Sequence, residues 1–167
     1  MYMVKVSPAG KQDGSLWEEK GGVEVAQIFV SHYDDKVVAL QFLFFENGKL
    51  VLSKRHGVDN LCENFNSVDL DYPSEFLTSI SGSVQLTMNG DSFLSSISFG
   101  TNKGSYGPIG KASAAGNIYH FNYQIGNGRS IGGFHGSKCR YGIESIGVYV
   151  KTINIFNILQ LREKKKW

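Results

Sequence analysis

Residues 37–52 read VVALQFLFFENGKLVL, and this stretch decides the fold class. From Val37 to Phe45 the apolar pattern has the two-residue period of a β-strand. Glu46-Asn47-Gly48 interrupts it, and Asn-Gly is a preferred dipeptide of a tight hairpin turn. The apolar pattern then resumes as far as Leu52. The stretch therefore predicts two antiparallel strands joined by a short turn.

Segments of the same kind recur along the chain, and no stretch before residue 150 has a sustained helical period. Gly82 is expected to separate two of the strands as a turn. About a dozen short strands predict an all-β sandwich, barrel or prism. Besides the first hairpin, the expected strands are Val25 to Val30, Ser67 to Asp71, Phe76 to Ser81, Ser83 to Met88, Phe93 to Gly100, Ser105 to Tyr106, Asn117 to Ile125, Ser130 to Gly136 and Glu144 to Lys151.

The composition indicates one globular domain in a chain of 167 residues. Apolar residues make up 41% and charged residues 19%, and 20 glycines against 3 prolines favour tight turns over stiff linkers. We expect a domain over residues 1–152 and a basic extension over 153–167, either a short amphipathic helix or a frayed end. The net charge of +2 predicts neither nucleic-acid nor membrane partners.

Cysteine and histidine usage argues against both a disulfide framework and a metal site. Cys62 and Cys139 are far apart in sequence, which favours free thiols in a reducing compartment. No histidine pair has metal-ligand spacing, so no metal or other cofactor is expected. Neither an apolar leader nor a run of ~18 apolar residues occurs. A cytoplasmic or nucleocytoplasmic location is expected.

Two patterns could be mistaken for catalytic machinery. Gly128 to Gly132 matches the Gly-x-Ser-x-Gly elbow around Ser130, but that elbow needs a following helix and this one runs into a predicted strand. Cys139 lies near His135 in sequence, without further support for a nucleophile pair. We expect no catalytic residue and no enzyme activity.

Several segments, in the correct order over roughly residues 4–151, resemble the jacalin-related lectin family. The wording "LSKRHG" and "YPSEFLTSISG" is similar to that of a plant, single-domain, antiviral type within it. The matching segments are Ser7 to Gly10 with Gly14 and Trp17 to Glu19, Val25 to Val30, Arg55 to Gly57, Asp71 to Gly82, Thr101 to Gly104 with Tyr106 to Gly110, Ile131 to Gly136, and Ile143 to Val150.

This resemblance implies a β-prism of three four-stranded Greek-key sheets around a pseudo-threefold axis, with a sugar held at one end and no metal. It also implies that the sugar contacts a glycine of the first loop, which falls on Gly14. That position could equally be a plain turn glycine.

The second sugar-binding element implied by the resemblance is a Gly-x-x-x-Asp segment before the last strand. Here it covers Arg140, Tyr141, Gly142, Ile143 and Glu144, so Arg replaces Gly and Glu replaces Asp. Glutamate still accepts two hydroxyl hydrogen bonds, but its extra methylene moves the oxygens by ~1.5 Å. Arg140 could occupy the pocket or form an ion pair there.

Two further features bear on specificity. Tyr141 could stack on a sugar ring or cap the prism. The turn formed by Met88, Asn89, Gly90 and Asp91 could lie beside the pocket or be an ordinary hairpin turn.

Two functions therefore stay open. One is a mannose- or glucose-type lectin in plant defence, binding saccharides and glycoproteins and working as a homo-oligomer. The alternative is a protein-interaction module of plant defence with a degenerate sugar site, suggested by Arg140, Glu144 and the basic tail.

Overall fold

The computed structural model describes residues 3–21, 24–59, 64–112, 116–125 and 128–151, and all regular elements in those ranges are strands. The predicted extension over 153–167 and Cys62 lie outside the described residues. Within them, no helix has the length and apolar character needed to cross a membrane. The strands are β1 (Met3–Lys5), β2 (Ser15–Glu19), β3 (Glu24–Tyr33), β4 (Lys36–Glu46), β5 (Lys49–Leu52), β6 (His56–Gly57), β7 (Asn64–Asp69), β8 (Leu77–Leu86), β9 (Ser92–Thr101), β10 (Ser105–Gly110), β11 (Asn117–Gln124), β12 (Ile131–Cys139) and β13 (Gly142–Lys151).

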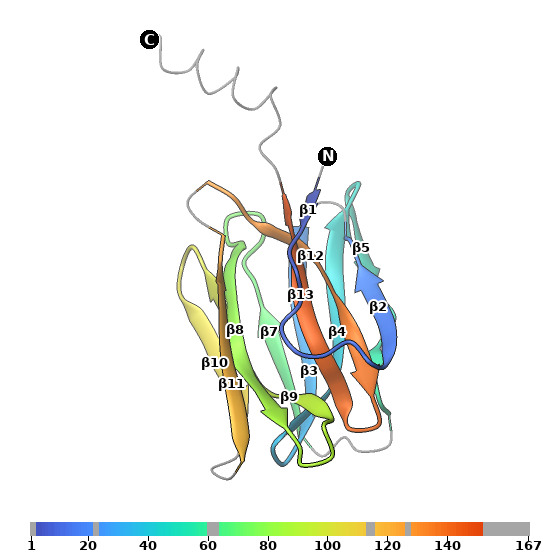
Figure 1. Cartoon of the computed structure of the whole chain (residues 1–167). Coiled ribbons are helices and arrows are strands. Elements are labelled where there is room, and N and C mark those ends of the chain that lie inside the picture. The colour runs from blue at the N-terminus through green and yellow to red at the C-terminus, as the bar shows by residue number, and fades with distance from the viewer. Residues whose placement is uncertain (1–2, 22–23, 60–63, 113–115, 126–127, 152–167) are drawn as a thin grey trace, which may run out of the picture.

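The strands form three antiparallel sheets around one core (Figure 1). Sheet B has the order β5-β4-β3-β7, and sheet C has the order β10-β9-β8-β11. In each, three consecutive strands are followed by a fourth that returns beside the first, which is a Greek key. Sheet A has the order β1-β13-β12-β2, the same pattern closed by strands from both ends of the chain. The predicted three-sheet architecture is confirmed, with the short β6 added beside β4.

The first hairpin forms as its sequence predicts. Asn47 and Gly48 have φ values of 49° and 77°, which is the left-handed pair of a type I′ turn. Along β4, Leu40, Phe42 and Phe44 are at most 2% exposed, and the residues between them point outward. The turn and the alternation together fix which face of sheet B is buried.

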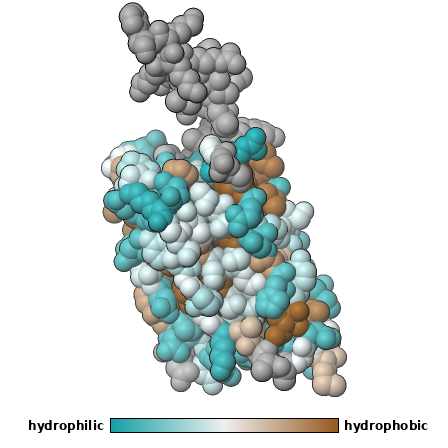
Figure 2. Space-filling model, turned by 90° about the vertical axis from the view of Figure 1, so that its left-hand side faces the viewer, coloured by the Kyte–Doolittle hydropathy of each residue, from teal (hydrophilic) through white to brown (hydrophobic). Residues whose placement is uncertain are grey.

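Aromatic stacking joins sheets A and B in the core. The Phe42 ring lies 4.3 Å from that of Phe134 on β12, with an interplanar angle of 7°. Trp17 on β2 extends this stack, with ring centroids 6.2 Å from Phe42 and 4.7 Å from His56. Sheet C contributes fully buried Leu94, Ile97 and Phe99. The outward face of sheet C is mostly polar or neutral, with small apolar areas (Figure 2).

The expected turn at Gly82 is wrong. The structure runs one strand, β8, straight through this position. A Cβ on Gly82 would overlap the Ser96 carbonyl oxygen and lie 2.9 Å from the Phe121 ring. Glycine is therefore needed for close strand packing, which a lone glycine in a strand pattern can equally indicate.

Candidate functional site

A polar pocket of about 510 Å³ opens at one end of the prism, where three turns meet. These are the loop before β2, the β8–β9 turn and the β12–β13 turn; Figure 1 shows the last two side by side at its lower end. The cation of Lys11 also joins two of these turns, because its Nζ donates to the Gly90 carbonyl. The lining residues are Asp13, Gly14, Asn89, Asp91, Cys139, Arg140 and Glu144.

Glu144 reaches the pocket because β13 carries a bulge. Ser137 pairs with Ser145 and Lys138 with Ile143, so Glu144 has no partner in the ladder. A bulge of this kind redirects a side chain. The Glu144 Oε1 atom accepts hydrogen bonds from the Gly14 N–H at 2.8 Å and from the Ser137 hydroxyl at 2.7 Å.

The second carboxylate oxygen of Glu144, Oε2, is available to a ligand. The residue is only 4% exposed and lines the pocket, yet Oε2 accepts no hydrogen bond from any residue the structure describes. Ser137 is fully buried and lies 2.7 Å from the Ser145 hydroxyl, which can donate to it in turn. The serine pair therefore holds Oε1 and leaves Oε2 for a ligand.

Gly14 has a packing reason to be glycine. A Cβ there would overlap the Lys138 carbonyl oxygen, so the first loop packs backbone to backbone on β12. Its N–H donates a hydrogen bond to the Glu144 carboxylate. Close packing therefore requires glycine at position 14, and the same packing directs the Gly14 N–H at Glu144 in the pocket.

Arg140 lies at the rim and makes an ion pair. Its Nη2 lies 2.9 Å from Asp91 Oδ2 and 2.9 Å from the Tyr141 hydroxyl. The guanidinium also sits 4.9 Å from the centre of the Tyr141 ring. Of the two possibilities raised by the sequence, the ion pair is the one observed, and it ties the β8–β9 turn to the β12–β13 turn.

The remaining predicted site residues divide between the pocket and its surroundings. Tyr141 packs against Phe93 with ring centroids 5.3 Å apart and is covered by Arg140, as expected of a cap rather than a stacking platform. Gly142 has a φ of +133° beside Val37 and Val38, and Ile143 is fully buried. In the β8–β9 turn, Asn89 and Asp91 line the pocket, whereas Met88 is fully exposed away from it and Gly90 supplies the turn conformation.

Sequence reasoning missed Asp13 and Cys139 as lining residues. Asp13 is adjacent to Gly14, which is the only signal that could have found it. Burial raises the pKa of the Cys139 thiol, and its Sγ lies 3.6 Å from the Ser92 carbonyl oxygen. The thiol is therefore held protonated at neutral pH, and its chemistry is not that of a nucleophile.

Other candidate chemistry in the described residues is structural. His135 Nε2 bonds to the Val6 carbonyl oxygen at 2.7 Å, and His56 Nε2 lies 2.8 Å from Glu19 Oε1. Ser130 leads directly into β12, so a strand stands where the elbow needs a helix. Across the described ranges, no group of three or more His, Cys, Asp or Glu side chains could hold a metal ion.

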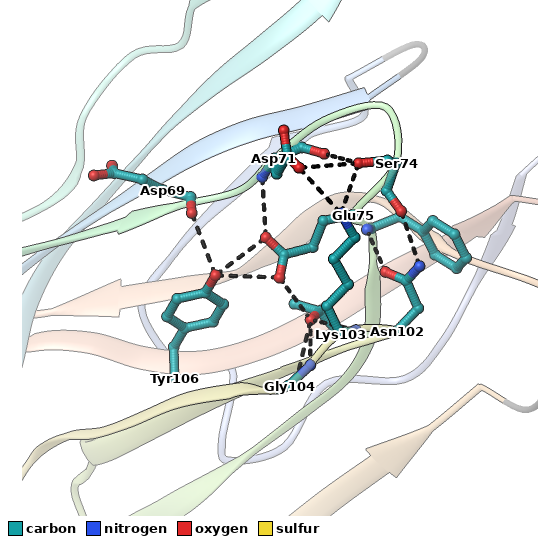
Figure 3. Close-up of polar contacts among 10 residues, drawn as sticks. Asp69, Asp71, Ser74, Glu75, Asn102, Lys103, Gly104 and Tyr106 are labelled. Carbon is teal, nitrogen blue, oxygen red and sulfur yellow. Dashed lines mark hydrogen bonds and ion pairs between the residues drawn. The ribbon is translucent and has the colours of Figure 1, made fainter.

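Glu75 lies in the loop before β8, at the opposite end of the prism from the pocket (Figure 1), and its polar contacts, shown in Figure 3, account for the acidic residue of the "YPSEFL" segment. Its Oε1 accepts the Asp71 N–H at 3.0 Å and the Tyr106 hydroxyl at 3.1 Å, and its Oε2 accepts the Thr101 hydroxyl at 3.0 Å. The Asp71 N–H, followed by these hydroxyls, lowers the pKa of Glu75. Lys103 closes the cluster with an ion pair to Asp71 at 3.0 Å. This cluster fastens the loop before β8 to the β9–β10 turn.

Comparison with known proteins agrees with this geometry. Residues 6–149 match the family described as "Jacalin-like lectin domain". "Protein RESTRICTED TEV MOVEMENT 1" of Arabidopsis thaliana is 35% identical over 155 residues, covering 89% of this chain and 87% of that protein. The mannose binding lectin from Champedak has a TM-score of 0.78 at 26% identity, covering 91% of this chain and 99% of that one. The artocarpin–mannotriose complex gives the same four values, 0.78, 26%, 91% and 99%.

Three Greek-key sheets around one core, with a polar pocket at the end where their turns meet, define a β-prism of the lectin type. The chain belongs to the jacalin-like lectin family. The expected family and fold are both confirmed.

Proposed function

We propose that the protein is a carbohydrate-binding lectin that holds a mannose- or glucose-type pyranose in the end pocket and acts in plant defence, without catalysis. The observation that carries this proposal is the Glu144 carboxylate, fixed at Oε1 by two donors and open to the pocket at Oε2. A fixed carboxylate oxygen is a strong acceptor for a sugar hydroxyl. Asp13, Asn89 and Asp91 add further polar groups around it.

The solved relatives support the sugar class. One is a mannose binding lectin and another is a complex with mannotriose. The name of the Arabidopsis relative supports a role in defence. A single open pocket gives weak binding, so we propose that useful strength comes from several pockets in a homo-oligomer. Sedimentation of the purified protein with and without a branched mannoside tests that point, and a strict monomer would contradict it.

Isothermal titration with methyl α-mannoside tests the pocket, using wild type beside three variants of Glu144. Glu144→Ala removes the carboxylate and should abolish binding. Glu144→Gln keeps the shape, loses the charge, and should weaken binding by roughly tenfold. Glu144→Asp is the informative change, because a carboxylate shorter by one methylene no longer reaches the Gly14 N–H and leaves that donor to the sugar. We expect this variant to bind roughly fivefold tighter than wild type.

The second candidate function is a protein-interaction module with a closed sugar site. Its supporting observation is that the Gly14 N–H is already bonded within the protein and that Arg140 and Asp91 pair across the rim. This function predicts no heat with mannoside in folded wild type, and binding that appears only in Glu144→Asp. Binding in wild type that is lost in Glu144→Ala would contradict it.

A further inference from the structure

A second hollow lies on the outer face of sheet B, on the side of the prism rather than at its end. It has a volume of about 250 Å³ and is lined by Phe29, Ser31, Gln41, Arg55 and Phe65. None of these residues lines the end pocket. Its volume falls below the ~300–1,000 Å³ of pockets that enclose drug-sized ligands, so it suits a single small ring.

The hollow follows from residue size on neighbouring strands. Phe29 and Ser31 point outward from β3, opposite to the fully buried Ile28 and Val30. Ser31 pairs with Ala39 on β4 and with Phe65 on β7. Ser31 is the smallest residue that lines the hollow, and the larger side chains of Phe29 and Phe65 stand beside it.

Polar groups at the floor and wall have unused hydrogen-bonding capacity. Ser31 is 5% exposed, and its hydroxyl makes no hydrogen bond to any residue within the described ranges. Gln41 uses its Nε2 on the Ser53 carbonyl and keeps its Oε1. The Ser31 hydroxyl can therefore donate a hydrogen bond to a ligand in the hollow and accept one from it.

Charge and aromatic surface complete the lining. Arg55 uses Nη1 on Asp59, whose side chain is 84% exposed, so the ion pair is weakened by solvent and the other guanidinium donors stay available. Phe65 is 60% exposed and stacks on Phe29 with ring centroids 5.8 Å apart and an interplanar angle of 18°. An exposed ring face accepts the apolar face of another ring.

We propose that this side hollow binds one pyranose ring that carries a carboxylate, as in a uronic acid. The apolar ring face packs on Phe65, ring hydroxyls bond to Ser31 Oγ and Gln41 Oε1, and the carboxylate pairs with Arg55. The guanidinium fork matches a planar carboxylate, and Arg55 is the one cation among the described residues that line the hollow. The site is separate from the end pocket and would give each chain a second glycan contact.

Amide chemical shifts of the full ¹⁵N-labelled chain, titrated with methyl β-glucuronide and separately with methyl β-glucoside, test the proposal. We expect the glucuronide to shift the amides of Phe29, Ser31 and Phe65 and to bind roughly tenfold tighter than the glucoside. Phe65→Ala should abolish these shifts, and Arg55→Gln should remove the preference for the glucuronide. Tyr119→Ala, at a ring 55% exposed on β11, is the matched control and should change neither.

The proposal is overturned if the glucuronide leaves the Ser31 amide unmoved in folded protein, or if Arg55→Gln keeps the preference. The same spectra separate this result from the fate of the end pocket. Glu144→Ala should leave the glucuronide shifts intact, and methyl α-mannoside is read independently at the Gly14 amide.

Discussion

The Gly14 N–H lies 2.8 Å from Glu144 Oε1, across 130 positions of sequence. Gly14 lies directly before β2 and Glu144 lies on β13, and both strands belong to sheet A, which is built from the two ends of the described chain. The geometry of the site and the packing of the first loop on sheet A therefore depend on each other.

Gly14→Ala should damage both. The added Cβ would overlap the Lys138 carbonyl oxygen, so the loop must move and its N–H leaves Glu144. We expect a loss of about 1–3 kcal/mol in the free energy of unfolding and no measurable mannoside binding. Urea unfolding and calorimetry measure the two effects. Gly104→Ala is the control, because a Cβ on Gly104 would meet nothing within 4 Å and the variant should leave both values near wild type.

Glu75→Gln should remove a pH-dependent part of the stability. The folded-state pKa of Glu75 is lowered, so its ionised form stabilises the fold in full above the ordinary value of 4.5 and loses that effect as pH falls through the folded value. At neutral pH the variant should unfold about 1–3 kcal/mol more easily. Below pH 4 the difference from wild type should shrink. Urea unfolding at several pH values measures it, and a gap that stays constant with pH would contradict the assignment.

Much of the sheet architecture was predictable from the sequence, because local turn chemistry and alternation act over few residues. Asn47-Gly48 forms the turn that its dipeptide indicates, and the apolar residues of β4 fall on the buried face. Short β1 and β2 were not predicted, since β1 has three residues and most residues of both strands are exposed. The turn predicted at Gly82 was wrong because a single glycine in a strand pattern can indicate either a turn or the close approach of a neighbouring strand.

The site was predictable only as far as the family resemblance carried it. That resemblance assigned Gly14 and Glu144 to one site, and in the structure the two residues are hydrogen-bonded. The bonds of Ser137 and the Arg140–Asp91 ion pair depend on the register of β12 and β13 and on the bulge at Glu144. A strand's periodicity does not encode where a bulge falls, so these partners needed the structure.

His135→Gln should change how stability depends on pH below 6.5. Burial lowers the pKa of His135 from its ordinary value of 6.5, and its ring bonds to the Val6 carbonyl over Gly147. Above pH 6.5 the imidazole is neutral in both states and does not reduce the stability. As pH falls from 6.5 toward the lower pKa of His135 in the folded state, the unfolded state binds more protons and wild type loses stability. The variant should lose that slope in thermal unfolding. Exposed His120→Gln is the matched control and should keep it.

Tyr149 should ionise last among the tyrosines that the structure describes. Burial, together with its hydrogen bond to Glu18 and the charge of that carboxylate, raises the pKa of Tyr149 to about 12. Tyrosinate absorbance followed with increasing pH should show one late step, and Tyr149→Phe should remove it. Tyr119→Phe should leave the late step in place. A late step that survives in Tyr149→Phe would belong to another tyrosine and would contradict this prediction.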